Sequence, residues 1–213
     1  MAPPIRRGLT VRGAAIAGIV GPALFMLVVV VLTVVQYDFM LRIGWQPLED
    51  PAGAWPSGLA LGPYGWAQSL NFAASGTLLI VFAIGLHRGV VSGSKAGPAL
   101  LALSGVAMAL LAFETDPIIR TSPRSLHGWV HDLAFVLFIA SLTPSFFFLW
   151  RRMEKDPLWR SHGRYTLIAG LLTIPLFLLP GPTYYLSLAL ILGWLEVLAI
   201  RLWAVADGRS APP

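Results

Sequence analysis

The stretch that decides the fold is Gly13–Gln36, GAAIAGIVGPALFMLVVVVLTVVQ, a long apolar run without a charged side chain. A helix of this length rises roughly 36 Å, enough to cross the ~30 Å hydrocarbon core of a bilayer. Arg6, Arg7 and Arg12 precede the run, as basic residues precede a secretion signal. The run is nevertheless too long for the apolar part of a signal peptide. We therefore predict a membrane span that is retained.

The composition of the whole chain points the same way. Of its 213 residues, 56% are hydrophobic and only 12% are charged, whereas soluble domains carry roughly a quarter charged residues. A water-soluble globule is therefore excluded. A net charge of +5 would suggest a nucleic acid partner for a soluble protein. In a membrane protein, basic residues instead mark the segments on the cytoplasmic side, so we expect no nucleic acid partner. Because the chain has no cysteine, disulfides and thiolate metal sites are excluded as well.

Six segments of the chain approach or exceed the roughly 17 to 25 apolar residues that a helical span needs. They cover about residues 13–36, 64–86, 97–113, 127–150, 165–179 and 183–204. The sequence thus predicts an all-α fold, a polytopic six-helix bundle that forms a single integral membrane domain over residues 1–213. We expect the lipid bilayer as its environment and a multi-pass location in the plasma (cytoplasmic) membrane.

Between the first two predicted spans lies a segment of different character, from Tyr37 to Pro63. It contains prolines at four positions and tryptophans at two. It is too rich in proline for a helix and too aromatic for a free linker. We expect this segment to fold over the bundle at the level of the lipid headgroups.

The basic residues are distributed unevenly over the connecting segments. If the N-terminus is cytoplasmic, twelve of the fifteen Lys and Arg residues fall on cytoplasmic segments, and only Arg42, Arg120 and Arg124 fall outside. This bias follows the positive-inside rule. We predict that the N-terminus and the C-terminus are both cytoplasmic, which places the segment before the fourth span at the outer face.

Ionisable side chains concentrate in that outer segment, from Glu114 to Asp132. His127 and His131 stand at i and i+4 and therefore share one face of a helix, with Asp132 about 100° further round. Such an arrangement can hold a cation, a proton or the head group of a substrate. The cluster is the strongest candidate for a functional site in the sequence.

One hypothesis is a metal-dependent hydrolase that acts on a lipid or a lipid-linked substrate. Zinc or another divalent metal needs about three protein ligands and an open position for water. The candidate metal ligands are Asp116, His127 and His131. Asp132 or Glu114 would then act as the catalytic base or accept a hydrogen bond from a ligand.

Two other interpretations stay open. The cluster also fits a structural latch at the outer face, in which Asp116 accepts hydrogen bonds from the backbone of the following turn. The third interpretation is transport or binding of a small molecule or ion through Glu196, an acidic side chain well inside the last predicted span. Asn71 and Ser75, at i and i+4 on the second span, are candidates for a ligand pocket.

Short motifs along the chain resemble a known family. Phe113–Pro117 reads Phe-Glu-Thr-Asp-Pro, and Leu126–Asp132 reads Leu-His-Gly-Trp-Val-His-Asp. Together with Gly-Pro-x-Leu-Phe at Gly21–Phe25, Asn-Phe-x-x-x-Gly at Asn71–Gly76 and Phe-Ala-x-Gly-Leu at Phe82–Leu86, they are similar to the signature of domain of unknown function 998. The resemblance covers nearly the whole chain. It implies a bacterial or archaeal multi-pass membrane protein of six or so helices, and no particular activity.

Overall fold

The computed structural model describes residues 9–117 and 123–208, and the predicted all-α fold is confirmed for them. The long helices are α1 (Leu9–Val35), α3 (Gly65–Gly89), α4 (Ala96–Leu110), α5 (Leu126–Glu154), α6 (Arg160–Leu178) and α7 (Thr183–Ala206). The short ones are α2 (Tyr37–Arg42) and the 3₁₀ helices η1 (Pro51–Gly53) and η2 (Ser57–Leu61). A long helix thus lies at each of the predicted segments.

Four of the described helices are long and apolar enough to cross a membrane, namely α1, α3, α5 and α7. The chain is therefore a multi-pass membrane protein. Helix α4 is apolar but has only 15 residues, which corresponds to roughly 22 Å of helix. The predicted third span continued to Phe113, but α4 ends at Leu110.

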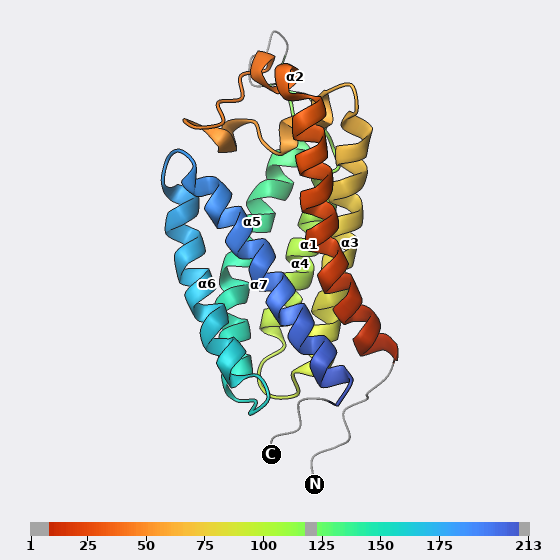
Figure 1. Cartoon of the computed structure of the whole chain (residues 1–213), viewed down its shortest axis with the longest axis vertical. Coiled ribbons are helices and arrows are strands. Elements are labelled where there is room, and N and C mark those ends of the chain that lie inside the picture. The colour runs from red at the N-terminus through yellow and green to blue at the C-terminus, as the bar shows by residue number, and fades with distance from the viewer. Residues whose placement is uncertain (1–8, 118–122, 209–213) are drawn as a thin grey trace.

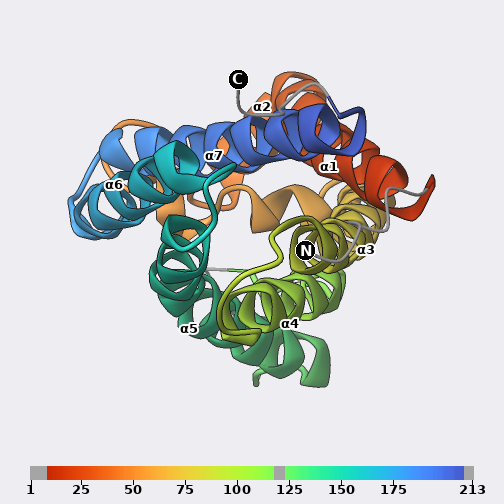
Figure 2. The same cartoon turned by 90° about the horizontal axis from the view of Figure 1, so that it is seen from below.

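The long helices form a ring around the long axis of the molecule (Figure 2). Each packs on the next long helix along the chain, and α7 returns to α1 to close the ring. Arg12 Nε, near the start of α1, lies 3.8 Å from the carboxylate of Asp207, just after α7. Both ends of the described chain therefore lie at one end of the bundle (Figure 1), which we call the base. The opposite end, with residues 36–64 and 179–182, is the loop end.

Small residues bring α3 and α4 into backbone contact. A methyl group at Gly76 would overlap the backbone nitrogen of Ala109 and the carbonyl oxygen of Gly105. A methyl group at Gly105 would lie 2.8 Å from the carbonyl oxygen of Gly76. Glycines of this kind are typical of helix contacts in membranes, where close approach provides van der Waals contact.

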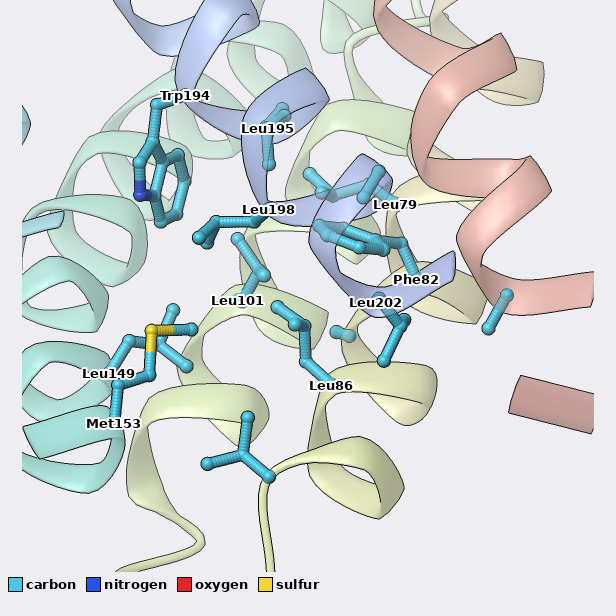
Figure 3. Close-up of a cluster of buried hydrophobic side chains, with 14 of the residues drawn as sticks. Leu79, Phe82, Leu86, Leu101, Leu149, Met153, Trp194, Leu195, Leu198 and Leu202 are labelled. Atoms are coloured by element: carbon cyan, nitrogen blue, oxygen red, sulfur yellow. The ribbon is translucent and has the colours of Figure 1, made fainter. Parts of the chain in front are cut away.

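Large apolar side chains form a buried core inside the bundle (Figure 3). They project from α3, α4, α5 and α7 toward one another, and they include Leu79, Phe82, Leu86, Leu101, Leu149, Met153, Trp194, Leu195, Leu198 and Leu202. Trp194 is fully buried, packs against the tilted ring of Phe146 at 4.2 Å between ring centroids, and donates its indole N–H to Thr166 Oγ1 at 3.0 Å.

A buried arginine at the base ties α5 to the connection between α3 and α4. Arg152 is only 3% exposed, and its guanidinium donates hydrogen bonds to four backbone carbonyl groups. These belong to His87, Val90, Gly93 and Ser94. The carbonyl groups at the end of a helix lack partners within the helix, so Arg152 provides a donor for those of His87 and Val90 at the end of α3 and for two more in the turn that follows.

The segment between α1 and α3 folds across the loop end, as predicted (Figure 1). The prediction that it contains no helix is wrong for Tyr37–Arg42, which form α2. This stretch holds no proline, and its first and last turns carry Asp38 and Arg42, which complement the helix dipole. Just before α2, the buried Gln36 donates to the carbonyl oxygen of Leu59 at 3.2 Å and accepts from the Tyr64 N–H at 3.0 Å. The segment is therefore firmly tethered.

Candidate functional site

A pocket of about 260 Å³ lies inside the ring of helices. Its walls are formed mainly by apolar side chains of α1, α3, α5 and α7, including Phe25, Phe72, Leu79, Phe138, Leu142, Leu188, Leu192 and Leu195. Residues 52–58 of the tethered segment cover it. Its polar lining at the loop end comprises Ser57, Thr115, Asp116, His131 and Asp132, which we call the mouth.

His131 occupies the second turn of α5 and is only 4% exposed. Its Nδ1 lies 2.7 Å from the carbonyl oxygen of Phe113, and its Nε2 lies 3.0 Å from the hydroxyl oxygen of Ser57. A carbonyl oxygen can only accept a hydrogen bond, so Nδ1 carries a proton. In the neutral imidazole Nε2 is then the acceptor, and the hydroxyl group of Ser57 donates to it.

The start of α5 is fixed by a set of local contacts. The hydroxyl oxygen of Ser125 accepts from the Gly128 N–H at 2.9 Å, which is a helix cap. The Ser125 N–H in turn donates to the Asp116 carboxylate at 3.1 Å. A side chain at Gly128 would overlap that carboxylate. These contacts hold α5 in the position that turns His131 into the pocket.

Arg124 links the two carboxylates of the mouth. Its Nε lies 3.8 Å from the Asp116 carboxylate, and its guanidinium pairs with the Asp132 carboxylate. The guanidinium also lies over the Trp129 ring at 4.7 Å from the centroid. The ion pairs and the aromatic contact hold the acidic side chains at the rim of the pocket.

Ser57 begins η2, in the segment that covers the pocket. On one side of it, Trp55 donates its indole N–H to Thr33 Oγ1 at 2.8 Å and packs edge-on against Tyr185 with 5.1 Å between ring centroids. On the other side, Leu59 is fully buried. The hydroxyl group of Ser57 therefore projects toward His131 from an anchored backbone.

The predicted metal ligands do not gather in one place. Asp116 and His131 line the pocket, but His127 is exposed in the first turn of α5, where its ring packs edge-on against Phe113 at 5.6 Å. Both ring nitrogens of His131 already have hydrogen-bond partners. Within residues 9–117 and 123–208, no group of three or more His, Asp or Glu side chains could hold a metal ion. A zinc or other divalent site stays a prediction, which elemental analysis of the purified protein tests.

The two predicted catalytic residues differ in position. Asp132 lines the pocket beside His131, whereas Glu114 is exposed and lies outside the pocket lining. Arg120, part of the predicted outer charge, lies outside the described residues. Of the acidic residues in the cluster, Asp116 and Asp132 are therefore the ones that the fold brings to the mouth.

The predicted pocket residues Asn71 and Ser75 lie on α3, facing α1. Asn71 donates its amide to the carbonyl oxygen of Phe25 at 3.2 Å, and Ser75 donates to the Asn71 side-chain oxygen at 3.3 Å. Ser75 also lines the pocket. Glu196 is half-buried on α7 outside the pocket lining, without a hydrogen-bond or ion-pair partner among the described residues. Transport through Glu196 stays a prediction.

The family model described as "Protein of unknown function (DUF998)" matches residues 19–207. The chain belongs to the DUF998 family. The resemblance read from the motifs is thereby confirmed. The match includes every residue of the pocket lining except Ala17 and Gly18. Comparison with curated proteins and with solved structures finds no match. The DUF998 description names no activity, so the function has to be inferred from the geometry of the site.

The sequence does not predict Ser57 as a site residue. It lies 74 residues before His131 in the chain, in a segment whose prolines and tryptophans indicate only a folded cover. The Pro-Ser-Gly sequence at residues 56–58 indicates a turn and matches no pattern that would indicate a catalytic serine. The contact depends on how the cover is tethered across the bundle, which no local pattern encodes.

Replacing Asp116 with alanine is expected to lower the free energy of unfolding of this DUF998 protein by about 1–2 kcal/mol, because the Ser125 N–H loses its acceptor and Arg124 loses one of its two carboxylate partners. Thermal unfolding in detergent measures the change. Glu114→Ala is the matched control, since that carboxylate is exposed two residues away. Equal melting temperatures for the two variants would contradict the role of Asp116 in holding α5.

Proposed function

We propose that this DUF998 protein binds a small amphipathic molecule in the pocket, with its single apolar chain among the helices and its polar head at the mouth. The observation that carries the proposal is the pocket of about 260 Å³ whose apolar walls meet hydroxyl, imidazole and carboxylate groups at one end. An apolar cavity with a few convergent polar groups is the usual form of a ligand site.

The size of the pocket limits the ligand. A cavity of roughly 150 Å³ binds benzene, so by proportion about 260 Å³ accommodates a ligand of about ten non-hydrogen atoms. A two-chain phospholipid is far larger than this. A single chain of about ten carbon atoms is the best match.

The mouth favours a neutral head group that can both donate and accept hydrogen bonds. Ser57 and His131 already form a donor–acceptor pair there, and Asp132 is engaged by Arg124. A hydroxyl or ester group can bond to these side chains without breaking the ion pair. The proposal therefore names a short-chain alcohol or ester as the class of ligand.

The proposal includes an arrangement in the plasma membrane with six spans, both termini in the cytoplasm and the mouth facing outward. Its support is the distribution of charge among the described residues. The basic residues on helices and connections at the base are Arg12, Arg88, Lys95, Arg151, Arg152, Lys155, Arg160, Arg164 and Arg201, whereas Arg42 and Arg124 lie at the loop end. This bias follows the positive-inside rule. Arg6, Arg7 and Arg209 lie outside the described residues.

Thermal unfolding in phosphatidylcholine nanodiscs with 1-decanol tests the proposal. A ligand at about 100 times its dissociation constant adds about 2.7 kcal/mol to the stability of the folded state, which raises the melting temperature by roughly 5–11 °C in a protein of this size. Decane, which has the chain without the hydroxyl group, is the control and is expected to have a much smaller effect. No shift with 1-decanol, or equal shifts with both compounds, would contradict the proposal.

A further inference from the structure

The contact between Ser57 and His131 has the geometry of a nucleophile with its general base. We propose that these two residues form a catalytic pair that cleaves the ester bond of a short-chain amphiphile held in the pocket. The inference rests on the proposed function, because the pocket has to hold the substrate. It adds a reaction and assigns a role to each of the two side chains.

The first argument is the direction of the hydrogen bonds. The carbonyl oxygen of Phe113 fixes the proton of His131 on Nδ1, which leaves the lone pair of Nε2 directed at the Ser57 hydroxyl group. The Nε2–Oγ distance of 3.0 Å lies within the roughly 2.6–3.2 Å that proton transfer from a nucleophile to its base requires. The ring is thus in the tautomer that can remove a proton from Ser57.

The second argument is the rigidity of the imidazole. A general base works best when a third group fixes its orientation. Here the backbone oxygen of Phe113 is that third group, and it accepts the hydrogen bond of Nδ1 at 2.7 Å. The buried ring of Phe72 packs edge-on against the imidazole at 6.3 Å between centroids. His131 is therefore oriented from two sides before any substrate binds.

The third argument is location. Ser57 and His131 both line the pocket, at the point where its apolar walls meet the mouth. An amphiphile whose chain lies against Phe138, Leu188 and Leu192 would place the first polar atoms of its head beside the Ser57 hydroxyl group. The class of substrate that this arrangement fits is a carboxylic ester with a short acyl chain.

The reaction proceeds in two balanced steps. The Ser57 oxygen attacks the ester carbonyl carbon while Nε2 of His131 takes the hydroxyl proton, and the bond between that carbon and the alcohol oxygen breaks. The alcohol leaves with the proton that His131 returns to it, and the acyl group stays on Ser57. Water then attacks the acyl-enzyme with His131 again as the base, and the products are a carboxylic acid and the free serine.

Hydrolysis of p-nitrophenyl butyrate by the purified protein in nanodiscs tests the reaction. We expect measurable turnover in the wild type and a loss of about 100-fold or more in Ser57→Ala and in His131→Asn. Ser145→Ala is the matched control, because Ser145 lies on the same helix as His131 but is outside the pocket lining and donates to the carbonyl oxygen of Leu142 at 2.6 Å. Absence of turnover in the wild type, or unchanged turnover in Ser57→Ala, would overturn the inference.

A second experiment separates a catalytic pair from a structural contact. The chain has no cysteine, so Ser57→Cys introduces one thiol, which His131 would deprotonate. Iodoacetamide should modify it at pH 6 about tenfold faster than the thiol of Thr115→Cys, which lies at the same mouth. Adding His131→Asn should remove the difference, and equal rates for the two thiols would count against the pair.

The outcomes also distinguish this inference from the proposed function. Stabilisation by 1-decanol without any ester hydrolysis would leave the ligand site intact and refute the catalytic pair. Absence of stabilisation by 1-decanol would refute the ligand site itself. Ser57→Ala should lose hydrolysis but keep part of the stabilisation by 1-decanol, since the apolar walls and His131 are still present.

Discussion

Leu192→Trp is expected to abolish most of the stabilisation that 1-decanol gives to the wild-type protein. Leu192 lies on α7 in the wall of the pocket, and an indole ring in its place would occupy space that the ligand chain needs. Overfilling a packed site costs typically 1–3 kcal/mol, which corresponds to about 5- to 150-fold weaker binding. Thermal unfolding in nanodiscs, with and without 1-decanol, measures the loss.

The matched control for this substitution is Leu186→Trp. Leu186 lies on the same helix but is 59% exposed and outside the pocket lining. The substitution makes the same chemical change on the outer side of the helix ring, so the stabilisation by 1-decanol should stay as in the wild type. If Leu192→Trp binds 1-decanol as well as Leu186→Trp does, the ligand is not in the pocket.

Arg152→Met is expected to lower the free energy of unfolding by about 3–5 kcal/mol, the largest effect on stability that we predict. The methionine side chain keeps part of the apolar volume of the arginine stem but donates no hydrogen bond. The carbonyl groups of His87, Val90, Gly93 and Ser94 would lose a charged donor, and a hydrogen bond to a charged group contributes about 1.5–3 kcal/mol. A decrease of roughly 6–20 °C in melting temperature is the measurable result.

The adjacent arginine provides the control for that measurement. Arg151 is exposed, and its guanidinium lies over the rings of Phe147 and Trp150 at 5.0 and 5.2 Å from their centroids. Such exposed contacts contribute about 0.5–1 kcal/mol, so Arg151→Met should change the melting temperature by only a few degrees. Similar losses in both variants would show that Arg152 stabilises the base no more than a surface residue does.

The fold was predictable to the extent that it depends on the length of continuous apolar runs in the sequence. Continuous apolar runs predict α1, α3, α5 and α7 because the bilayer imposes a minimum span. The end of α4 was not predictable, since residues 111–113 are as apolar as the helix itself and yet form a turn. The helix α2 was missed for the opposite reason, because the prolines that follow it dominate the composition of the segment.

The candidate site was predictable only in part. Helical spacing correctly placed His127 and His131 on one helix, but spacing does not show which turns lie inside the bundle. His131 is buried, while His127, one turn earlier, is exposed. The partners of His131 are Phe113, in the turn after α4, and Ser57, in η2, and they meet it only in the folded chain.

The role of Arg152 shows a further limit of the sequence. In the chain it is one basic residue among several in a charged connection, and the positive-inside rule explains it as a topological signal. The fold buries it against the turn between α3 and α4. A charge that marks the side of the membrane can thus also hold the helices together, and only the tertiary contacts distinguish the two roles.

Photo-crosslinking with a ten-carbon alcohol that carries a diazirine on its chain tests the central claim most directly. The protein is labelled in nanodiscs, and the modified residues are mapped by mass spectrometry with and without an excess of 1-decanol. We predict labelling of the pocket walls at Phe138, Leu142 and Leu188 that excess 1-decanol suppresses. Labelling confined to outward-facing residues such as Leu133 and Leu186, and unaffected by the excess, would contradict the claim that the pocket binds an amphiphile.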